Sequence, residues 1–187
     1  MPIRTRTVGL LAATALTLAA CGSAADDADA DSTGDDTAGS TAEGDAEQAM
    51  EVPDELTFTA ESLDGTEIHG EAYAEGPAVF WFWTPWCTVC QSEAPSLAEA
   101  HADHGGEVEF VGVAADDELA AMQDFVSTYE LGGFEHINDA ERDVWTRFGV
   151  TSQPAYAFLD GDGDVDLVRG SVSEDELGDR LDALTSS

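Results

Sequence analysis

Runs of apolar residues with two different periods divide residues 52–187 into predicted strands and helices. Residues 78–83 (AVFWFW) and residues 108–115 (VEFVGVAA) are almost continuously apolar. Runs of this length are typical of strands buried on both faces of a sheet, so we predict two central strands. Residues 56–70 instead alternate between apolar and polar positions around the Asp-Gly pair that begins at Asp64, which favours a hairpin with a tight turn.

Residues spaced as on one face of a helix follow the predicted central strands. We predict a helix at residues 89–104, bent near Pro95 because a proline interrupts helical hydrogen bonding. A second helix is predicted at residues 116–130, with acidic residues at its start that complement the helix dipole. The remaining pattern predicts, in order, a strand at 134–138, a helix at 140–149, a strand–turn–strand at 155–170 and a helix at 173–185 capped by Ser173.

The order of these elements defines the fold class. A hairpin is followed by β, α, β, α, β, α, and then by a second hairpin and a closing helix. Alternation of buried strands with helices is typical of α/β proteins, and the second hairpin adds antiparallel strands. We therefore predict an α/β fold with a mixed β-sheet flanked by helices and with an N-terminal β-hairpin extension.

Residues 1–20 have the pattern of an export signal. Arg4 and Arg6 precede an apolar run at residues 8–20 that is too short for a typical membrane-spanning helix. The run ends in LAAC, which resembles the lipobox of bacterial lipoproteins. That resemblance implies cleavage before Cys21 and attachment of lipid to it, so that the protein is anchored to the cell membrane of a bacterium, outside the cytoplasm. The alternative is an ordinary secretory cleavage site with Cys21 merely nearby.

Residues 22–51 have the composition of a disordered linker. The segment is rich in Asp, Glu and small residues and contains no aromatic residue. It cannot bury enough apolar surface to offset the entropy lost on ordering, and its like charges favour an extended chain. We therefore predict a lipoprotein signal peptide at residues 1–20, a lipid-anchored acidic linker at 21–51 and one folded domain at 52–187.

The charge balance excludes several classes of partner. The chain has 40 acidic residues against 6 basic ones, and its formal net charge is −34. Nucleic acids and anionic lipid headgroups are bound by Lys and Arg side chains, so this chain would repel both. We expect a heavily solvated acidic surface and no binding to nucleic acid.

The chain has 3 cysteines. If Cys21 carries lipid, as the lipobox resemblance implies, Cys87 and Cys90 remain as a pair. Export places that pair outside the cytosol, where disulfides persist. The pair lies between a predicted buried strand and a predicted helix, so its first sulfur is at a helix N-terminus. Free amides and the helix dipole stabilise a thiolate there. Such a thiolate can attack a disulfide, and the second cysteine can resolve the mixed disulfide one turn later. The main hypothesis is therefore redox chemistry, with Cys87 as nucleophile and Cys90 as resolving thiol.

A zinc site and a purely structural disulfide are two other possible roles for Cys87 and Cys90, and both fit the sequence less well. A zinc site needs about four ligands, and the histidines form no second pair at finger-like spacing. Those histidines are His69, His101, His104 and His136. His101 and His104 lie three residues apart on a predicted helix. Two histidines at this spacing can both ligate one metal ion, but they more often lie on a solvated helix face. A purely structural disulfide closing so short a loop constrains the unfolded chain little. We expect neither a metal nor a cofactor.

A calcium-binding loop is a further alternative at residues 160–166, which read DGDGDVD. Val165 and Ser171 stand where an EF-hand loop requires Gly and Glu. We therefore predict a polar hairpin turn there.

The residues around the cysteine pair resemble a known signature. Residues 86–97 (WCTVCQSEAPSL) are similar to the W-C-x-x-C-x-x-E-x-P-x-L signature of extracytoplasmic thioredoxin-like proteins of the TlpA, ResA and DsbE type. This family includes thiol–disulfide oxidoreductases of cytochrome c maturation and of secreted-protein folding. The resemblance extends over residues 55–184 and implies a thioredoxin-like fold with a redox-active disulfide between Cys87 and Cys90.

The same family has a cis-proline packed against its cysteine pair. Residues 148–163 (FGVTSQPAYAFLDGDG) match that segment, which assigns the cis-proline to Pro154, with Gln153 before it. By resemblance, the backbone at these two residues would pair with an extended substrate as in strand addition. Trp86 would shape the substrate surface beside Cys87.

Glu93 matches the glutamate of the signature, which is implicated in proton handling in the cytochrome-maturation branch. A buried carboxylate here can exchange protons with Cys90, and the alternative is a solvated charge on the helix face. Thioredoxin has a buried Asp on the strand before its motif, and that position is Trp81 here. The departure argues against assuming thioredoxin's reducing role.

The resemblance implies a membrane-anchored extracytoplasmic thiol–disulfide oxidoreductase. Residues 144–155 (VWTRFGVTSQPA) resemble actinobacterial secreted DsbE-like proteins, several of which are oxidants, so oxidation of substrates is favoured over reduction. The reducing alternative would act on apocytochrome c. The implied partners are exported proteins with thiols or disulfides and a membrane redox-recycling protein.

Two other functions remain open. A thiol peroxidase of the redoxin group has the motif P-x-x-x-T-x-x-C; Thr84 matches its threonine, but Phe80 stands at the position of its proline. A non-enzymatic metal-delivery lipoprotein would bind copper or zinc through Cys87 and Cys90 without disulfide exchange.

Overall fold

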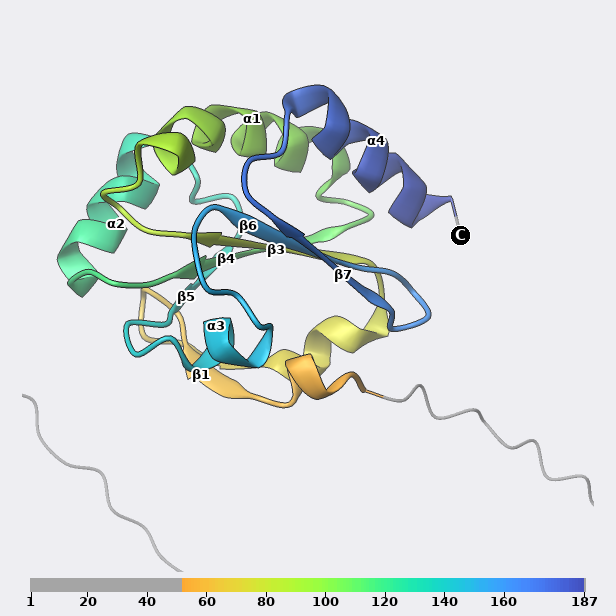
Figure 1. Cartoon of the computed structure of the whole chain (residues 1–187), viewed down its shortest axis with the longest axis horizontal. Coiled ribbons are helices and arrows are strands. Elements are labelled where there is room, and N and C mark those ends of the chain that lie inside the picture. Colours follow the sequence, from red (N-terminus) through yellow and green to blue (C-terminus); the bar gives the residue numbers. More distant parts are fainter. Residues whose placement is uncertain (1–51, 187) are drawn as a thin grey trace, which may run out of the picture. The chain divides into compact units, whose positions relative to one another are not determined.

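A mixed five-stranded sheet forms the centre of the computed structural model, which describes residues 52–186; the predicted signal peptide and acidic linker at residues 1–51 lie outside the described residues. The strand order is β5-β4-β3-β6-β7 (Figure 1). The strands are β3 (Ala78–Trp83), β4 (Glu109–Ala114), β5 (Glu135–Asn138), β6 (Ala155–Leu159) and β7 (Val165–Arg169). β4 pairs in parallel with β3 and β5, while β6 pairs antiparallel with β3 and β7, so the predicted mixed sheet is confirmed.

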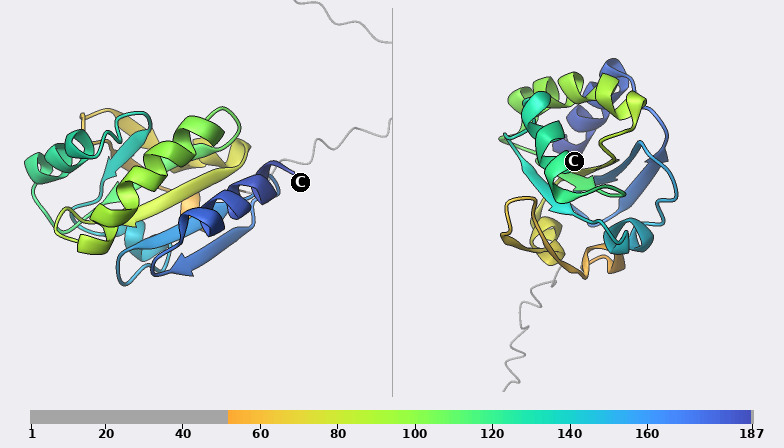
Figure 2. Two further views of the ribbon diagram at one scale, coloured as in Figure 1. Left: turned by 90° about the horizontal axis from the view of Figure 1, so that it is seen from above. Right: turned by 90° about the vertical axis from the view of Figure 1, so that its left-hand side faces the viewer.

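Helices cover both faces of this sheet. They are α1 (Thr88–His104), α2 (Leu119–Thr128), α3 (Asp143–Arg147) and α4 (Glu174–Thr185). α1, α2 and α4 lie on one face, and α3 lies on the other (Figures 1 and 2). No helix within residues 52–186 is long and apolar enough to cross a membrane.

The predicted N-terminal hairpin is confirmed as a separate two-stranded sheet of β1 (Thr59–Glu61) and β2 (Glu67–His69). It lies on the same side of the main sheet as α3 (Figure 1). Two 3-10 helices that we did not predict flank it, η1 (Asp54–Leu56) and η2 (Gly70–Glu75). Both are too short to leave a helical period in the sequence.

The aromatic strand β3 supplies both hydrophobic cores, because successive side chains of a strand point to opposite faces. All of its residues are buried. Trp81 and Trp83 pack beneath α1, α2 and α4, and Trp83 stacks on Phe125 with 4.3 Å between ring centroids. Phe80 and Phe82 face the other way, toward α3 and the hairpin. The continuous apolar run therefore reflects burial on both faces, as predicted.

The start of α2 corrects one prediction. The acidic residues were expected in the first turn of a helix beginning near Asp116, but α2 begins at Leu119. Asp116 has a φ of 57°, a left-handed conformation that a right-handed helix cannot contain. The acidic residues therefore form the loop before the helix, and Glu118 is its N-cap.

A close approach between β4 and β5 depends on Gly112. A Cβ at this position would collide with Nδ1 of His136, whose side chain lies against the glycine. His136 is buried, and its Nε2 lies 3.0 Å from the Leu131 carbonyl oxygen. Burial lowers the pKa of His136 to about 4, so the ring is neutral at neutral pH and Nε2 carries the proton that it donates to Leu131.

Candidate active site

The Cys-x-x-Cys segment lies at the carboxyl edge of the parallel strands. β3 ends at Trp83 and α1 begins at Thr88, so the intervening loop carries Cys87. The loops that follow β4 and β5 leave the sheet at the same edge, because both strands are parallel to β3. Ligand sites of open α/β sheets form from loops at this edge.

Cys87 and Cys90 are joined by a disulfide at the N-terminus of α1. Cys87 is the N-cap residue, and its sulfur accepts a hydrogen bond from the Cys90 amide at 3.1 Å. Cys87 is 7% exposed, whereas Cys90 is 0% exposed. Cys87 is therefore the more accessible of the two cysteines to a thiolate from another molecule. After cleavage, the same amide would stabilise a thiolate on Cys87.

The residue before Cys87, Trp86, has an exposed aromatic side chain. Within residues 52–186, the exposed large hydrophobic residues are Trp86, Val89 and Leu119. Trp86 is 54% exposed, and its indole Nε1 donates a hydrogen bond to the carbonyl oxygen of Asp116 at 3.2 Å. The ring is thus presented to solvent while one edge is tied to the loop after β4.

The peptide bond between Gln153 and Pro154 is cis, and Pro154 is buried. β6 begins at the next residue, Ala155, which pairs with Phe82 of β3. Continuing this antiparallel register brings Pro154 alongside the end of β3, at the edge that carries the cysteine pair. Gln153 is half-buried.

Glu93 is buried and hydrogen-bonded, so its side chain is not the solvated helix-face charge that was the alternative. It lies three positions after Cys90, on the same face of α1. Its residue is 8% exposed. Oε1 accepts hydrogen bonds from Ser171 Oγ at 2.5 Å and from the Val172 amide at 3.2 Å, and Oε2 accepts one from the Tyr156 hydroxyl at 2.9 Å.

Tyr156 brings this hydrogen bond from the strand beside β3. It pairs with Trp81 across the β3–β6 ladder, and both side chains are 1% exposed. Burial, followed by the neighbouring Glu93 carboxyl, raises the pKa of Tyr156 above its usual value, so the hydroxyl keeps its proton and donates. Where thioredoxin has a buried Asp, this protein therefore has an indole and, opposite it, a tyrosine that contacts Glu93.

Three residues that contact Glu93 or Trp86 were not predicted from the sequence. They are Tyr156, Ser171 and Asp116. A tyrosine in the apolar strand 155–159 was an available signal, because a buried hydroxyl needs a hydrogen-bond partner. The others carried no local signal.

Residues 52–186 contain no group of three or more His, Cys, Asp or Glu side chains arranged to hold a metal ion. The acidic turn between β6 and β7 is a hairpin turn, as predicted, in which Asp160 accepts backbone hydrogen bonds from Asp162 and Asp164.

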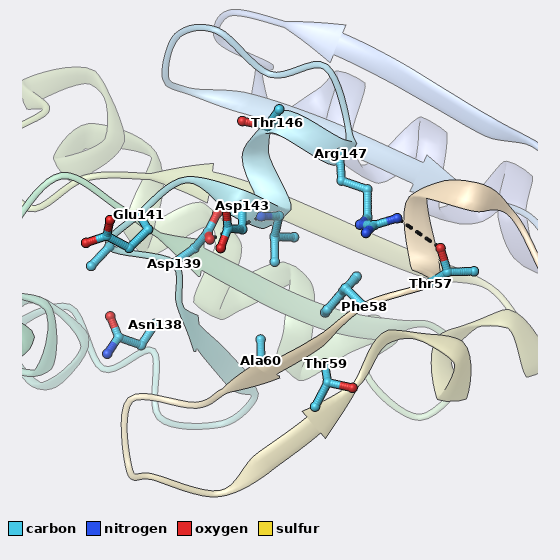
Figure 3. A pocket seen from close by; sticks show the side chains of 12 residues that line it. Thr57, Phe58, Thr59, Ala60, Asn138, Asp139, Glu141, Asp143, Thr146 and Arg147 are labelled. Carbon is cyan, nitrogen blue, oxygen red and sulfur yellow. Dashed lines mark hydrogen bonds between the residues drawn. The ribbon is translucent and has the colours of Figure 1, made fainter.

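A cavity of about 710 Å³ lies between β1 and α3 (Figure 3). Thr57 and Thr59 line it from the hairpin side, and Asp143, Thr146 and Arg147 line it from α3. No cysteine lines this cavity. The cysteine pair therefore lies outside this cavity, and the exposed aromatic side chain next to it is that of Trp86.

Known proteins match both the sequence and the fold. Residues 50–168 match the family model described as the AhpC/TSA family. The soluble secreted antigen MPT53 of Mycobacterium tuberculosis is 43% identical over 142 residues, which cover 74% of this chain and 81% of that protein. The thiol-disulfide oxidoreductase ResA of Bacillus cereus is 29% identical over 143 residues, covering 74% of this chain and 82% of ResA.

A solved structure of MTB DsbF, in mixed oxidised and reduced forms, superposes with a TM-score of 0.71 and is 52% identical. The match covers 72% of this chain and 100% of DsbF. The thioredoxin-like fold expected from residues 55–184 is thereby confirmed, as is the resemblance on which that expectation rested. The chain therefore belongs to the AhpC/TSA family, as a thioredoxin-fold thiol–disulfide oxidoreductase of the TlpA, ResA and DsbE type.

Proposed function

We propose that the protein oxidises the thiols of exported proteins by disulfide exchange through Cys87. The observation that carries this proposal is the Cys87 sulfur at the N-cap of α1, beside a fully buried Cys90. Amides at an N-cap stabilise a thiolate, and stabilising the reduced form makes a disulfide a stronger oxidant.

The reaction transfers two electrons from a substrate dithiol to the cysteine pair. A substrate thiolate attacks the Cys87 sulfur, the bond to Cys90 breaks, and Cys90 leaves as a thiolate that takes up a proton. The second substrate thiolate then attacks the substrate sulfur of the mixed disulfide. The substrate leaves with a disulfide, and Cys87 is released as a thiolate.

We assign the neighbouring residues to the same reaction. Glu93 exchanges a proton with Cys90, which its burial three positions along α1 supports. Gln153 and Pro154 offer backbone to an extended substrate segment, which their position at the start of β6 supports. Trp86 contacts the substrate with its exposed ring.

The proposal also includes the place of reaction. Residues 1–20 are a signal peptide, Cys21 carries the lipid, residues 21–51 are the linker, and residues 52–187 are the thioredoxin-like domain. The lipobox-like LAAC supports this assignment, as does a 43% identical relative named as a secreted antigen. The partners are exported proteins with thiols and a membrane protein that reoxidises the pair.

The reducing alternative, acting on apocytochrome c, uses the same residues and is supported by the similarity to ResA. The reduction potential of the Cys87–Cys90 pair separates the two directions. A value of about −120 mV is expected for an oxidant, and a value of about −270 mV would favour the reductant.

Trapping in cells tests exchange itself. In Cys90→Ser, the Cys87 thiolate can still attack a substrate disulfide, the reverse of the second step, and one substrate sulfur leaves as a thiolate. No Cys90 thiol remains to break the resulting mixed disulfide, so mixed disulfides with exported proteins should accumulate, and the double variant Cys87→Ser/Cys90→Ser should accumulate none. Absence of trapped partners, together with fast peroxide consumption by the reduced protein, would favour the peroxidase instead. Stoichiometric copper or zinc uptake without exchange would favour metal delivery.

A further inference from the structure

We propose that Asp116 and Arg142 are positioning residues for the redox site. Their ion pair fixes the loop that holds Trp86, and thereby sets how well protein substrates bind beside Cys87. The inference rests on the proposed exchange with protein substrates and identifies what shapes the surface that receives them.

The link between Trp86 and this ion pair is direct. Trp86 Nε1 donates to the carbonyl oxygen of Asp116, and the carboxylate of the same residue accepts two hydrogen bonds from Arg142. Arg142 Nε donates to Oδ1 at 2.8 Å, and Nη2 donates to Oδ2. A bidentate guanidinium–carboxylate pair fixes both position and orientation, which a single hydrogen bond does not.

The ion pair is partly exposed. The side chains of Arg142 and Asp116 are 33% and 32% exposed. Exposed pairs contribute little to stability unless their geometry is bidentate, as it is here. The pair joins the loop after β4 to the loop after β5, at the sheet edge that carries the cysteine pair.

Both residues adopt a left-handed backbone conformation, with φ of 57° for Asp116 and 62° for Arg142. This conformation is unfavourable for a residue with a Cβ and persists where surrounding contacts impose it. The ion pair joins the two side chains of these strained residues. Strain of this kind is concentrated at sites where geometry matters for function.

Arg142 is in turn fixed on the core. Its guanidinium carbon lies 4.4 Å from the centroid of the Trp145 ring, which is fully buried. Trp145 donates from Nε1 to the Val113 carbonyl at 3.1 Å. The buried ring of Trp145 thus contacts Arg142, and Arg142 in turn pairs with Asp116. Asp116 accepts the hydrogen bond from the exposed indole of Trp86, next to Cys87.

The Asp116–Arg142 ion pair lies near exposed hydrophobic side chains. Leu119 opens α2 three residues after Asp116 and is exposed, as are Trp86 and Val89. Releasing Asp116 would free Trp86 to move and would shift the start of α2. A protein substrate would lose apolar contacts, whereas a small dithiol needs only the Cys87 sulfur. The ion pair should therefore affect KM for proteins and leave the reaction with dithiothreitol unchanged.

The test compares Arg142→Gln with wild type in the oxidation of a reduced, unfolded polypeptide and of dithiothreitol. We expect KM for the polypeptide to rise about three- to tenfold, with kcat and the dithiothreitol rate constant within twofold. Arg147→Gln is the matched control. Within residues 52–186, Arg147 donates hydrogen bonds to the Asp54 carbonyl and to the Thr57 hydroxyl, the latter shown in Figure 3, and none to Asp116. This control variant should leave KM unchanged.

Two further readouts distinguish positioning from general loss of structure. The fluorescence attributable to Trp86, obtained by subtracting the spectrum of Trp86→Phe, should shift to the red in Arg142→Gln. In a Trp86→Phe background, adding Arg142→Gln should change KM by less than twofold. If Arg142→Gln fails to fold, Arg142→Lys serves instead. Lysine keeps the positive charge but cannot make the bidentate pair of hydrogen bonds to Asp116, so this variant should show the same rise in KM.

An unchanged KM in folded Arg142→Gln, or an equal loss in the Trp86→Phe background, would overturn the positioning role. Failure of the proposed function looks different. In that case wild type itself oxidises neither polypeptide nor dithiothreitol, while the shift in Trp86 fluorescence still reports whether the ion pair holds the indole.

Discussion

The hydroxyl of Tyr156 donates a 2.9 Å hydrogen bond to Glu93, joining β6 to α1 across 63 positions of sequence. The contact lies in the core beside the cysteine pair, where water is largely excluded. It makes the position of a single carboxylate depend on a residue of the central sheet. The contact should therefore affect both the stability of the fold and the reactivity of the cysteine pair. Substitutions of Tyr156 and of Glu93 test the two effects separately.

Tyr156→Phe removes the hydroxyl and leaves the ring. We expect the free energy of unfolding to fall by about 1–2 kcal/mol, because a buried carboxyl oxygen loses its donor. Chemical denaturation measures the change. Tyr129→Phe is the control, since the Tyr129 hydroxyl makes no hydrogen bond within residues 52–186. Equal effects of the two substitutions would contradict the expected role of the contact.

Glu93→Gln keeps the shape of the side chain and removes its ability to exchange a proton. We expect the exchange step to slow by about a hundredfold, at the lower end of the range of general acid–base catalysis. Stopped-flow fluorescence of the oxidised protein mixed with a reduced peptide measures the step. Glu99→Gln, on an exposed position of α1, should leave the rate unchanged. A rate equal to wild type in Glu93→Gln would remove Glu93 from the mechanism.

His136 predicts a pH dependence of stability. Burial lowers its pKa from 6.5 to about 4 in the folded protein. As pH falls below 6.5, the unfolded chain takes up a proton that the folded protein does not, so stability is lost progressively down to about pH 4. The loss should total about 3 kcal/mol relative to neutral pH.

The comparison that isolates this effect is His136→Asn, whose side chain cannot titrate. Denaturant unfolding between pH 7 and 4 should show a shallower decline in the variant than in wild type. His69→Asn, at an exposed histidine, should leave the wild-type slope intact. Parallel slopes for wild type and His136→Asn would contradict the prediction.

Cys21→Ser tests the proposed lipid anchor. Without a thiol to modify, the protein should move from the membrane fraction to the soluble extracytoplasmic fraction, and its intact mass should lack an acyl-bearing cysteine. Ser23→Ala, two residues away, should remain in the membrane fraction. A Cys21→Ser protein that still sediments with membranes would argue for another means of attachment.

Local patterns predicted most of the fold. The continuous run of residues 78–83 identified the central strand because burial on both faces leaves no polar position. Ser173 identified the start of α4, where its hydroxyl accepts a hydrogen bond from the Glu176 amide. The acidic residues before α2 were misplaced because Asp116 has a left-handed backbone conformation, which the local sequence pattern does not reveal.

The site was predictable only in part for the same reason. Cys87, Cys90, Glu93 and Pro154 belong to two contiguous segments with a recognisable spacing. The groups that contact Glu93 and Trp86 do not, since Ser171 lies 78 positions from Glu93 and Asp116 lies 30 positions from Trp86. Such pairs are brought together by strand order and register, which single-residue patterns do not specify.

The unequal burial of the two sulfurs has an analytical consequence. In the reduced protein, an alkylating reagent applied briefly should modify Cys87 and spare Cys90, whose residue is fully buried. Each reduced molecule would then gain one adduct, and each oxidised molecule none. The mass spectrum of the intact protein from rapidly quenched cells would thus count the two redox forms directly, without purification of any partner.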